Sequence, residues 1–345
     1  VTASRKEEAL HDVPATMTVL TSEDLAEIPA DDYGDILRNV PGLNVSQMSA
    51  RDIQITGRGA TNSLATSELV LLDNRTIYLD FFGFVMWDFL PVNPNEIKQV
   101  EVVRGPGSAV WGANATSGVI NLITKSPKEM VGTSILVGGG EIGTAYGSIT
   151  HAQASEKLGW KFSGGYYEQD AYDRPARNFG LFNFTDQDNE GTSQPKVDLR
   201  VDFDPNPETT LSFNAGYAAT DGIVHSGIGP FDIDKGANLS YVKADWARHA
   251  ARITFFANLL DADSTNLLTV DALTRNRLEF SFKTDTYNLD FANAAAFGEH
   301  NLLSYGANVR RNKFDLTIAA PQDTTRNEYG AYLQDEILIG DKVRW

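Results

Sequence analysis

The second part of the sequence alternates apolar and polar residues with a period of two. In residues 196–203 (KVDLRVDF) and again in residues 210–217 (TLSFNAGY), every second residue is apolar. Successive side chains of a β-strand point to opposite faces, so each of these strands has one apolar and one polar face. This pattern predicts an antiparallel sheet whose two faces meet different surroundings.

Ten strands of this kind are expected after about residue 128, with the beginning of another at 342–345. They are placed at residues 131–139, 144–154, 160–170, 196–204, 209–219, 237–246, 250–261, 275–296, 302–314 and 326–339. Short connections at 155–159, 205–208, 247–249, 297–301 and 340–341 are interleaved with long polar ones, of which the longest are 171–195, 220–236, 262–274 and 315–325. Short turns on one side and long loops on the other are typical of an outer-membrane barrel, whereas a soluble sandwich has no reason to keep that parity.

Composition narrows the class of protein. The sequence has no run of about 18 apolar residues, so a bilayer could be crossed only by a barrel. The net charge of -17 argues against a nucleic-acid partner. The absence of cysteine excludes disulfides, thiolate metal sites and cysteine nucleophiles. The first residues lack the apolar core of a signal peptide, so we expect a mature or clipped chain.

The stretch 97–125 (IKQVEVVRGPGSAVWGANATSGVINLITK) reads as a strand, a glycine-rich crossing and a second strand. Two short helices are expected before it, one beginning at Ser22 and one within 31–38. Further strands are expected at 53–56 and 69–73, so the chain up to Pro127 reads as a small mixed α/β unit.

This stretch resembles the second half of the plug domain of TonB-dependent outer-membrane receptors. Four segments before it, at 13–21, 35–43, 55–59 and 70–75, resemble the family's other plug segments in the same order. The resemblance implies an antiparallel membrane β-barrel with an amino-terminal plug: residues 1–12 follow the TonB box, 13–127 form the plug, and 128–345 form a truncated barrel. The family barrel has 22 strands, of which about the first ten are present. We therefore expect a fragment.

The resemblance also implies functional residues. Ligand contacts are expected on the plug loops that face outward, at Arg58, Thr61, Asn62, Ser63, Tyr78, Phe81, Phe82, Phe84 and Trp87. Arg58 and Arg104 are expected to lock the plug to barrel carboxylates, and Val1, Thr2 and Ala3 to be the tail of the TonB box, which pairs with TonB by strand addition. Two alternatives stay open: the arginines are ordinary turn residues, or the aromatic side chains pack against the plug core or the barrel wall.

Three other motifs favour structural interpretations. Residues 138–143 (GGGEIG) satisfy a dinucleotide-binding pattern, but a strand follows them where a helix is required, which favours a tight hairpin. Residues 186–197 begin like a calcium loop but end in Val197, where a glutamate is needed. The five histidines are scattered, without metal-ligand spacing. We expect no catalytic residues, no cofactor and no metal site, and therefore not an enzyme.

The sequence thus predicts a receptor for energised uptake of a scarce ligand across the outer membrane of a Gram-negative bacterium. A ferric siderophore is the commonest class of cargo in the family. The expected partners are TonB with its inner-membrane energising complex, outer-membrane lipid, and a small ligand such as a metal chelate. The alternatives are a passive porin or adhesin barrel, a soluble periplasmic binding protein, and a fragment that does not transport.

Overall fold

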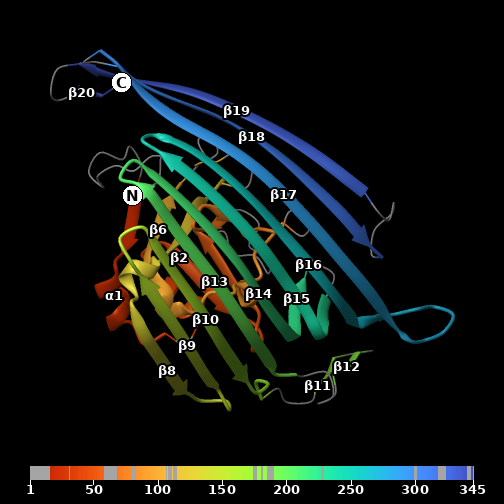
Figure 1. Ribbon diagram of the computed structural model, residues 1–345. Helices are drawn as coiled ribbons and strands as arrows, with labels where there is room; N and C mark the ends of the chain where they lie inside the picture. Colours follow the sequence, from red (N-terminus) through yellow and green to blue (C-terminus); the bar gives the residue numbers. More distant parts are fainter. Residues whose placement is uncertain are drawn as a thin grey trace.

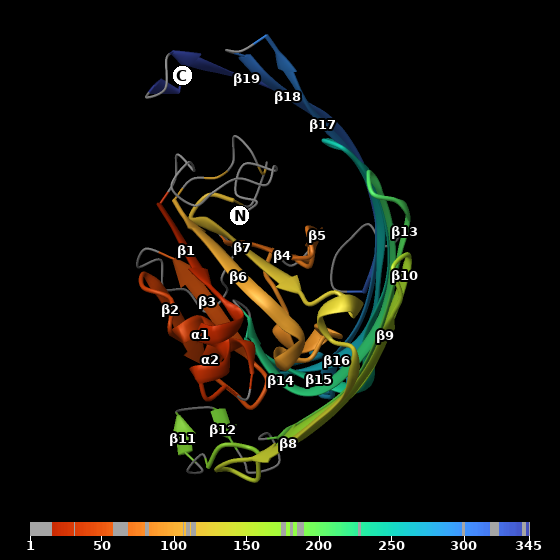
Figure 2. The same ribbon diagram turned by 60° about the vertical axis from the view of Figure 1, so that its left-hand side comes forward.

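A small domain sits against the concave side of a large curved sheet (Figure 1; Figure 2). The computed structural model describes residues 16–30, 32–57, 68–79, 83–105, 107, 111, 115–173, 177–179, 182–184, 190–226, 229–298, 301–317, 324–339 and 343–344. In Figure 2 the sheet curves around the small domain, which we call the plug.

The plug contains the two predicted helices and a five-stranded sheet. Its elements are β1 (Thr16–Leu20), α1 (Ser22–Glu27), α2 (Tyr33–Arg38), β2 (Leu43–Gln47), β3 (Ile53–Gly57), β4 (Glu68–Leu72), β5 (Arg75–Thr76), β6 (Ile97–Arg104) and β7 (Gly118–Thr124), with 3-10 turns η2 (Trp87–Phe89), η3 (Pro94–Glu96) and η4 (Pro127–Glu129). The sheet order is β1-β6-β7-β4-β5, with β4 and β7 parallel, while β2 and β3 form a separate hairpin.

Local sequence explains why these elements form where they do. A capping box starts α1, because the Thr21 hydroxyl accepts from the Asp24 amide at 3.3 Å and the Asp24 carboxylate accepts from the Thr21 amide at 2.8 Å. The β-branched residues of β6 and β7 form the centre of the plug core, where Val100, Ile120 and Leu122 have no exposed surface. The strand, crossing and strand predicted for 97–125 are confirmed at both strands.

The large sheet has eleven strands, each antiparallel to its neighbours. They are β8 (Gly132–Gly139), β9 (Ala145–Ala154), β10 (Leu158–Gln169), β13 (Thr192–Asn206), β14 (Thr209–Ser226), β15 (Gly229–Arg248), β16 (Ala251–Val270), β17 (Arg277–Phe297), β18 (Asn301–Leu316), β19 (Thr324–Ile339) and β20 (Val343–Arg344), with a small separate hairpin of β11 (Arg177–Phe179) and β12 (Phe182–Phe184). The sheet is open, with β8 at one edge and β20 at the other (Figure 1). All ten predicted strands and the beginning of an eleventh are present.

The prediction of long loops at 220–236 and 262–274 is wrong, because strands occupy most of these residues. Most of residues 220–236 belongs to β14 and β15, which pair as far as Ser226 and Gly229, and β16 runs to Val270 through most of the predicted loop 262–274. Both extensions are rich in polar residues and the first contains several glycines, so their composition indicated loops. Their ladders with neighbouring strands hold them extended, because each strand supplies the backbone partners that the next one needs.

The hairpin predicted at 138–143 is confirmed: the Gly140 amide donates to the Thr144 carbonyl at 2.9 Å, between β8 and β9. Of the calcium-like stretch, residues 186–189 lie outside the described residues, and 192–197 belong to β13. None of the helices in the described ranges is long and apolar enough to span a membrane.

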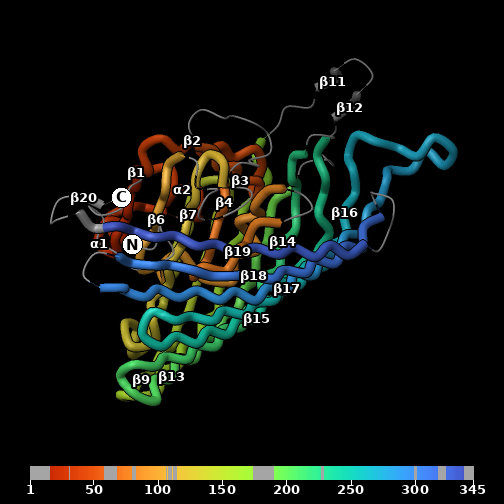
Figure 3. The backbone as a smooth tube through the Cα atoms, turned by 90° about the horizontal axis from the view of Figure 1, so that it is seen from above, coloured from red at the N-terminus to blue at the C-terminus, as the bar shows by residue number. Residues whose placement is uncertain are grey.

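The two faces of the large sheet differ as the alternation predicts. On β16 the outward-facing Ile253, Phe255 and Leu259 are exposed, whereas Phe256 and Asn258 face the plug and are buried. The strands lie side by side beneath the plug when the molecule is viewed from above (Figure 3). One apolar face is therefore open to the surroundings, and one mixed face is covered by the plug, as in a lipid-facing barrel wall around a lumen.

Candidate functional site

The described aromatic residues of the predicted ligand loop are buried. Tyr78 and Trp87 belong to the plug core, where the Trp87 ring lies 6.2 Å from the ring of Tyr33 between centroids. Phe84, with 4% of its surface exposed, packs in a second apolar cluster. Tyr78, Phe84 and Trp87 therefore pack against other apolar side chains, which is one of the two alternatives that the sequence left open. Their contact with a ligand stays a prediction.

The second cluster joins the plug to the barrel wall, and we call it the plug–wall cluster. The plug contributes Leu79, Phe84, Met86 and Phe89. The wall contributes residues of β14 to β18 that include Val224, Phe231, Ile233, Leu239, Leu260, Phe282, Phe314 and Leu316. An aromatic segment of the plug thus replaces water on this part of the wall, which stabilises the seated plug through burial of apolar surface.

Several predicted site residues lie outside the described residues. These are Val1, Thr2, Ala3, Arg58, Thr61, Asn62, Ser63, Phe81 and Phe82. Arg104 is described at the end of β6, where its Nη1 donates to the carbonyl of Pro41 at 3.0 Å, a contact within the plug. Its predicted pairing with a barrel carboxylate stays a prediction.

Charged side chains join plug and wall at several places that the sequence did not single out, and three of these are deeply buried. The first is an ion pair between Glu96 of η3 and Lys161 of β10, with 3.0 Å between Oε1 and Nζ and no more than 1% of either side chain exposed. A second bond fixes the lysine, because its Nζ donates to the carbonyl of Lys125 at 3.3 Å. Glu96 is itself held, since its other oxygen accepts from the Asn93 amide at 3.0 Å.

The second place is the buried side chain of Arg75 in β5. Its Nη1 donates to the Asn258 side chain at 2.7 Å, and its guanidinium lies 3.7 Å from the centroid of the Tyr241 ring. Asn258 in turn donates to the carbonyl of Thr76 at 2.8 Å. Burial lowers the pKa of Arg75 from its ordinary value, although the neighbouring Tyr241, Asp198 and Asp73 act in the opposite direction.

The third place lies at the turn between β2 and β3. Arg51 donates from Nε to Asp88 at 2.7 Å, and Thr220 of β14 donates to the same carboxylate oxygen at 2.6 Å. Beside it, the Asp52 carboxylate accepts from the amide of His225 at 2.8 Å. Nothing in the local sequence points to these pairs, because the partners come from distant segments that only the barrel brings together.

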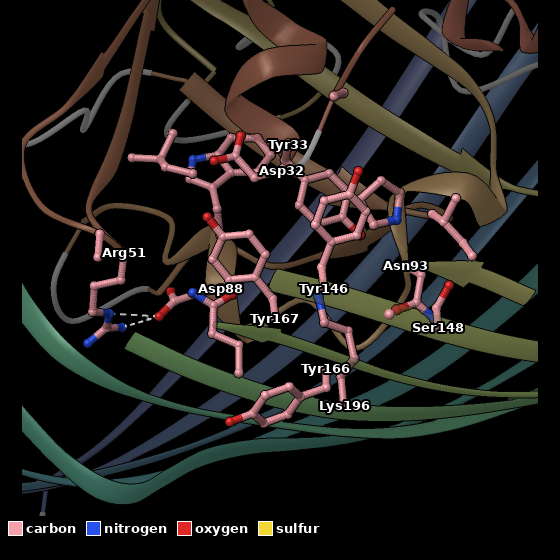
Figure 4. A pocket seen from close by; sticks show the side chains of 18 residues that line it. Asp32, Tyr33, Arg51, Asp88, Asn93, Tyr146, Ser148, Tyr166, Tyr167 and Lys196 are labelled. Carbon is pink, nitrogen blue, oxygen red and sulfur yellow. Dashed lines mark hydrogen bonds and ion pairs between the residues drawn. The ribbon is translucent and has the colours of Figure 1, made fainter. Parts of the chain in front are cut away.

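A small cavity separates the plug from β8, β9, β10 and β13 (Figure 4). Its volume is about 50 Å³, and polar or aromatic side chains line much of it, among them Asp32, Asn93, Tyr146, Tyr167 and Lys196. Burial raises the pKa of Asp32 to about 6. Ligand pockets usually measure roughly 300–1,000 Å³, so this space suits a few water molecules rather than a ligand. Plug and wall therefore lie close together around this cavity, at the seam between them.

Glu68 in β4 is a buried carboxyl group between two glycines. A Cβ added to Gly57 would lie 2.1 Å from one carboxyl oxygen, and one added to Gly118 would lie 2.6 Å from the other. Burial raises the pKa of Glu68 to about 7, against a hydrogen bond from the Gly57 backbone that lowers it. The glycines are thus required by close approach, and the carboxyl group is partly protonated at neutral pH.

No group of His, Asp or Glu side chains suited to hold a metal ion occurs in the described part of the chain. The arrangement is instead one of a plug fixed inside a wall by an apolar cluster and by three buried polar contacts. Such an arrangement can block a pore and can transmit movement between plug and wall.

Comparison with known proteins supports this arrangement at the level of sequence and of fold. Residues 9–119 match the model of the TonB-dependent receptor plug domain. The chain is 26% identical to the vitamin B12 transporter BtuB of Vibrio vulnificus over 352 residues, covering 99% of this chain and 55% of that sequence. It is 27% identical to the ferric enterobactin receptor PirA of Pseudomonas aeruginosa over 233 residues, covering 61% of this chain and 28% of that sequence.

The fold is shared with a crystal structure of a mutant of the ferric enterobactin receptor PfeA from Pseudomonas aeruginosa in complex with enterobactin. The TM-score is 0.67 at 16% identity, over 95% of this chain and 56% of that one. The chain therefore spans about half the length of the vitamin B12 transporter and of the solved receptor. The plug match and the sequence relatives together support a TonB-dependent receptor, and the shared fold shows a plug with part of a barrel.

Proposed function

We propose that this chain is part of an outer-membrane transporter that takes up a metal chelate, in the first place a ferric siderophore, with energy delivered through TonB. The observation that carries the proposal is the plug seated against the concave side of the curved wall, where an apolar cluster and a buried ion pair hold it. A passive porin needs an open lumen, which the plug occupies. Uptake by this protein therefore requires the plug to move, and movement against its contacts requires energy.

The class of cargo is proposed from the relatives. PirA is a receptor for ferric enterobactin, and BtuB is a transporter of vitamin B12, which is a cobalt chelate. Both cargoes are large molecules that surround a metal ion. Vitamin B12 is the second candidate, because the BtuB match covers nearly the whole of this chain.

The proposed mechanism uses both ends of the plug. The cargo binds at the outward-facing loops, for which Arg58, Thr61, Asn62, Ser63, Tyr78, Phe81, Phe82, Phe84 and Trp87 are the proposed contacts. TonB then pairs with the segment that contains Val1, Thr2 and Ala3 as an added strand, and its pull loosens the plug. Arg58 and Arg104 are proposed to hold the plug until that pull arrives.

The outer membrane of a Gram-negative bacterium is the proposed location. The exposed apolar face of the large sheet supports it, since residues such as Val197, Phe213 and Leu289 point away from the plug and stay uncovered. In a bilayer this face would contact lipid.

The test is uptake by the full-length receptor in a Gram-negative host that lacks its own receptors for the two probes. Radiolabelled ferric enterobactin and cyanocobalamin are supplied separately to cells with and without TonB. We expect accumulation of one probe that disappears without TonB or when Val1, Thr2 and Ala3 are deleted. Accumulation that does not depend on TonB would favour a passive pore, and accumulation of neither probe would reject the proposed cargo class.

A further inference from the structure

The turn between β2 and β3 is a compact polar structure that faces the barrel wall. Ser49, Arg51 and Asp52 are each no more than 3% exposed. The Ser49 hydroxyl accepts from the Asp52 amide at 3.1 Å, and the Met48 amide donates to the Asp52 carbonyl at 3.0 Å. The turn is therefore formed by its own hydrogen bonds before any contact with the wall is counted.

The wall meets this turn with an irregularity in β14. The register between β14 and β15 shifts between Thr220 and Gly222, and Gly222 has a φ of +100°. A Cβ on Gly222 would lie 2.3 Å from the carbonyl oxygen of Gly191, so only glycine fits. A bulge leaves backbone groups outside the regular ladder, where they are free to bond to another element.

The plug turn bonds to β14 at and just after this irregularity, beyond Ala218, the last residue of β14 that pairs with β13. The Ser49 hydroxyl donates to the Ile223 carbonyl, and Arg51 Nη1 is 3.4 Å from the Gly222 carbonyl. The His225 amide donates to Asp52 Oδ2 at 2.8 Å, and the His225 ring Nδ1 lies 3.1 Å from the same oxygen. Donors and acceptors of three plug residues, Ser49, Arg51 and Asp52, are thus matched by those of β14 at and after the bulge.

Arg51 links this contact to the plug segment that carries Phe84 and Phe89, the aromatic residues of the plug–wall cluster. Its guanidinium bonds to Asp88 in η2 (Figure 4) and lies 5.8 Å from the centroid of the Phe89 ring. Thr220 of the wall, at the start of the bulge, donates a hydrogen bond to the same Asp88 carboxylate at 2.6 Å. One buried arginine therefore joins the plug turn, the aromatic segment and the wall.

We propose that Arg51 and Asp52 form a clasp that fixes the outward-facing end of the plug to the β14 bulge, and that the clasp must open for cargo to pass. The proposal rests on the proposed transport function. Arg51 and Asp52 are positioning residues and are distinct from Arg58 and Arg104. The β14 bulge is the part of the wall from which the plug has to detach.

Geometry explains why the clasp must open. The seam beside it offers about 50 Å³, so a metal chelate passes only if plug and wall separate. Arg51 lines this cavity, with 1% of its side chain exposed, and it cannot follow the plug away from the wall while Thr220 and Gly222 hold the junction. Water entering the seam would rehydrate the charges as they separate, which makes a polar clasp reversible.

The first experiment asks whether the clasp is a single unit, and it needs no cargo. Hydrogen exchange is measured on the purified full-length receptor with Arg51→Gln, and with Arg38→Gln as the control, since Arg38 is half exposed on α2 and pairs within its own helix. We expect Arg51→Gln to speed exchange at residues 49–52, 87–89 and 222–225 together, and Arg38→Gln to leave all three unchanged. Faster exchange at 49–52 alone would overturn the clasp.

The second experiment asks whether the clasp opens during uptake. The chain has no cysteine, so the pair Asp52→Cys and His225→Cys can be bridged by a short, reducible thiol cross-linker. The control pair, Ser193→Cys and Asp221→Cys, has side chains 3.2 Å apart and joins wall to wall. Bridging Asp52→Cys to His225→Cys should abolish TonB-dependent accumulation of ferric enterobactin or cyanocobalamin, and reduction should restore it. Bridging the control pair should change nothing.

The outcomes separate the two proposals. Normal accumulation with the first bridge in place would show that cargo passes without release of the clasp. Accumulation of neither probe by the unmodified receptor would reject the proposed cargo, while the exchange experiment would still decide whether the clasp exists. If the reduced Asp52→Cys and His225→Cys variant fails to transport, the pair Asp88→Cys and Thr220→Cys, whose side chains lie 2.6 Å apart, bridges plug and wall at the same junction.

Discussion

Breaking the buried ion pair between Glu96 and Lys161 is expected to destabilise the plug strongly. Replacement of Lys161 by Met would leave the Glu96 carboxylate without its cation in a place that water does not reach, since neither side chain is more than 1% exposed. Removing one partner of a buried pair typically costs about 3–5 kcal/mol, because the remaining charge is desolvated and unpaired. We expect this cost to appear as loss of plug stability.

The expected size can be expressed as a melting temperature. For a domain of the plug's size, 1 kcal/mol shifts the midpoint of thermal unfolding by about 4–8 °C, so Lys161→Met should lower it by at least about 12 °C. The measurement is differential scanning calorimetry of the full-length receptor in detergent, following the transition of the plug. Adding Glu96→Gln to Lys161→Met should recover most of the loss, because no buried charge is then left over.

A second ion pair between plug and wall supplies the control. Lys128 and Asp204 lie 2.6 Å apart, but their side chains are 45% and 27% exposed. Exposed pairs are worth about 0–1 kcal/mol, so Lys128→Met should shift the midpoint by a few degrees at most. Equal effects of Lys161→Met and Lys128→Met would refute the reasoning, since burial is the only property on which the difference rests.

Two further predictions concern the plug. Glu68→Gln should leave plug stability nearly unchanged at pH 4 and raise it by up to about 3 kcal/mol at pH 8. The reason is that a carboxyl whose pKa is raised to about 7 when folded loses stability as pH rises from its ordinary pKa of 4.5 through 7. Calorimetry at the two pH values checks the sign, and a constant difference between Glu68→Gln and wild type would contradict it. Phe84→Ala should lower the free energy of unfolding by about 3–5 kcal/mol in the same assay, because it leaves a cavity in the plug–wall cluster. The control is Leu273→Ala, at a residue that is 93% exposed, which should lower it by less than about 0.5 kcal/mol. Similar costs for these two substitutions would show that the cluster does not hold the plug.

The strands could be predicted because their information is local. Alternation along residues 196–203 and 210–217 fixes both the type of element and the face that each side chain takes, and the structure bears out both. The ends of strands were harder to predict. Residues 220–226 and 262–270 mix polar and apolar residues without a period of two, so their pattern carries no sign of a strand, and pairing with neighbouring strands makes them extended.

The contacts between plug and wall could not be predicted for a different reason. Lys161 is one of several lysines in alternating strands, and nothing near it in the sequence indicates Glu96 as its partner. Arg51 has no neighbouring glycine, the feature that distinguishes Arg58 and Arg104 in the sequence. Pairing of this kind depends on how the wall curves around the plug, which is a property of the assembled fold rather than of any segment.

The continued pairing of β14, β15 and β16 beyond their alternating parts has a consequence for cargo capture. A long loop that closes over a ligand loses conformational entropy on binding, at about 1–2 kcal/mol for each residue whose backbone becomes fixed. Here, much of residues 220–236 and 262–274 is already held in ladders before any cargo arrives. The entropy was lost during folding, so this part of the rim can offer a preformed surface, and affinity there would depend on fit more than on closure.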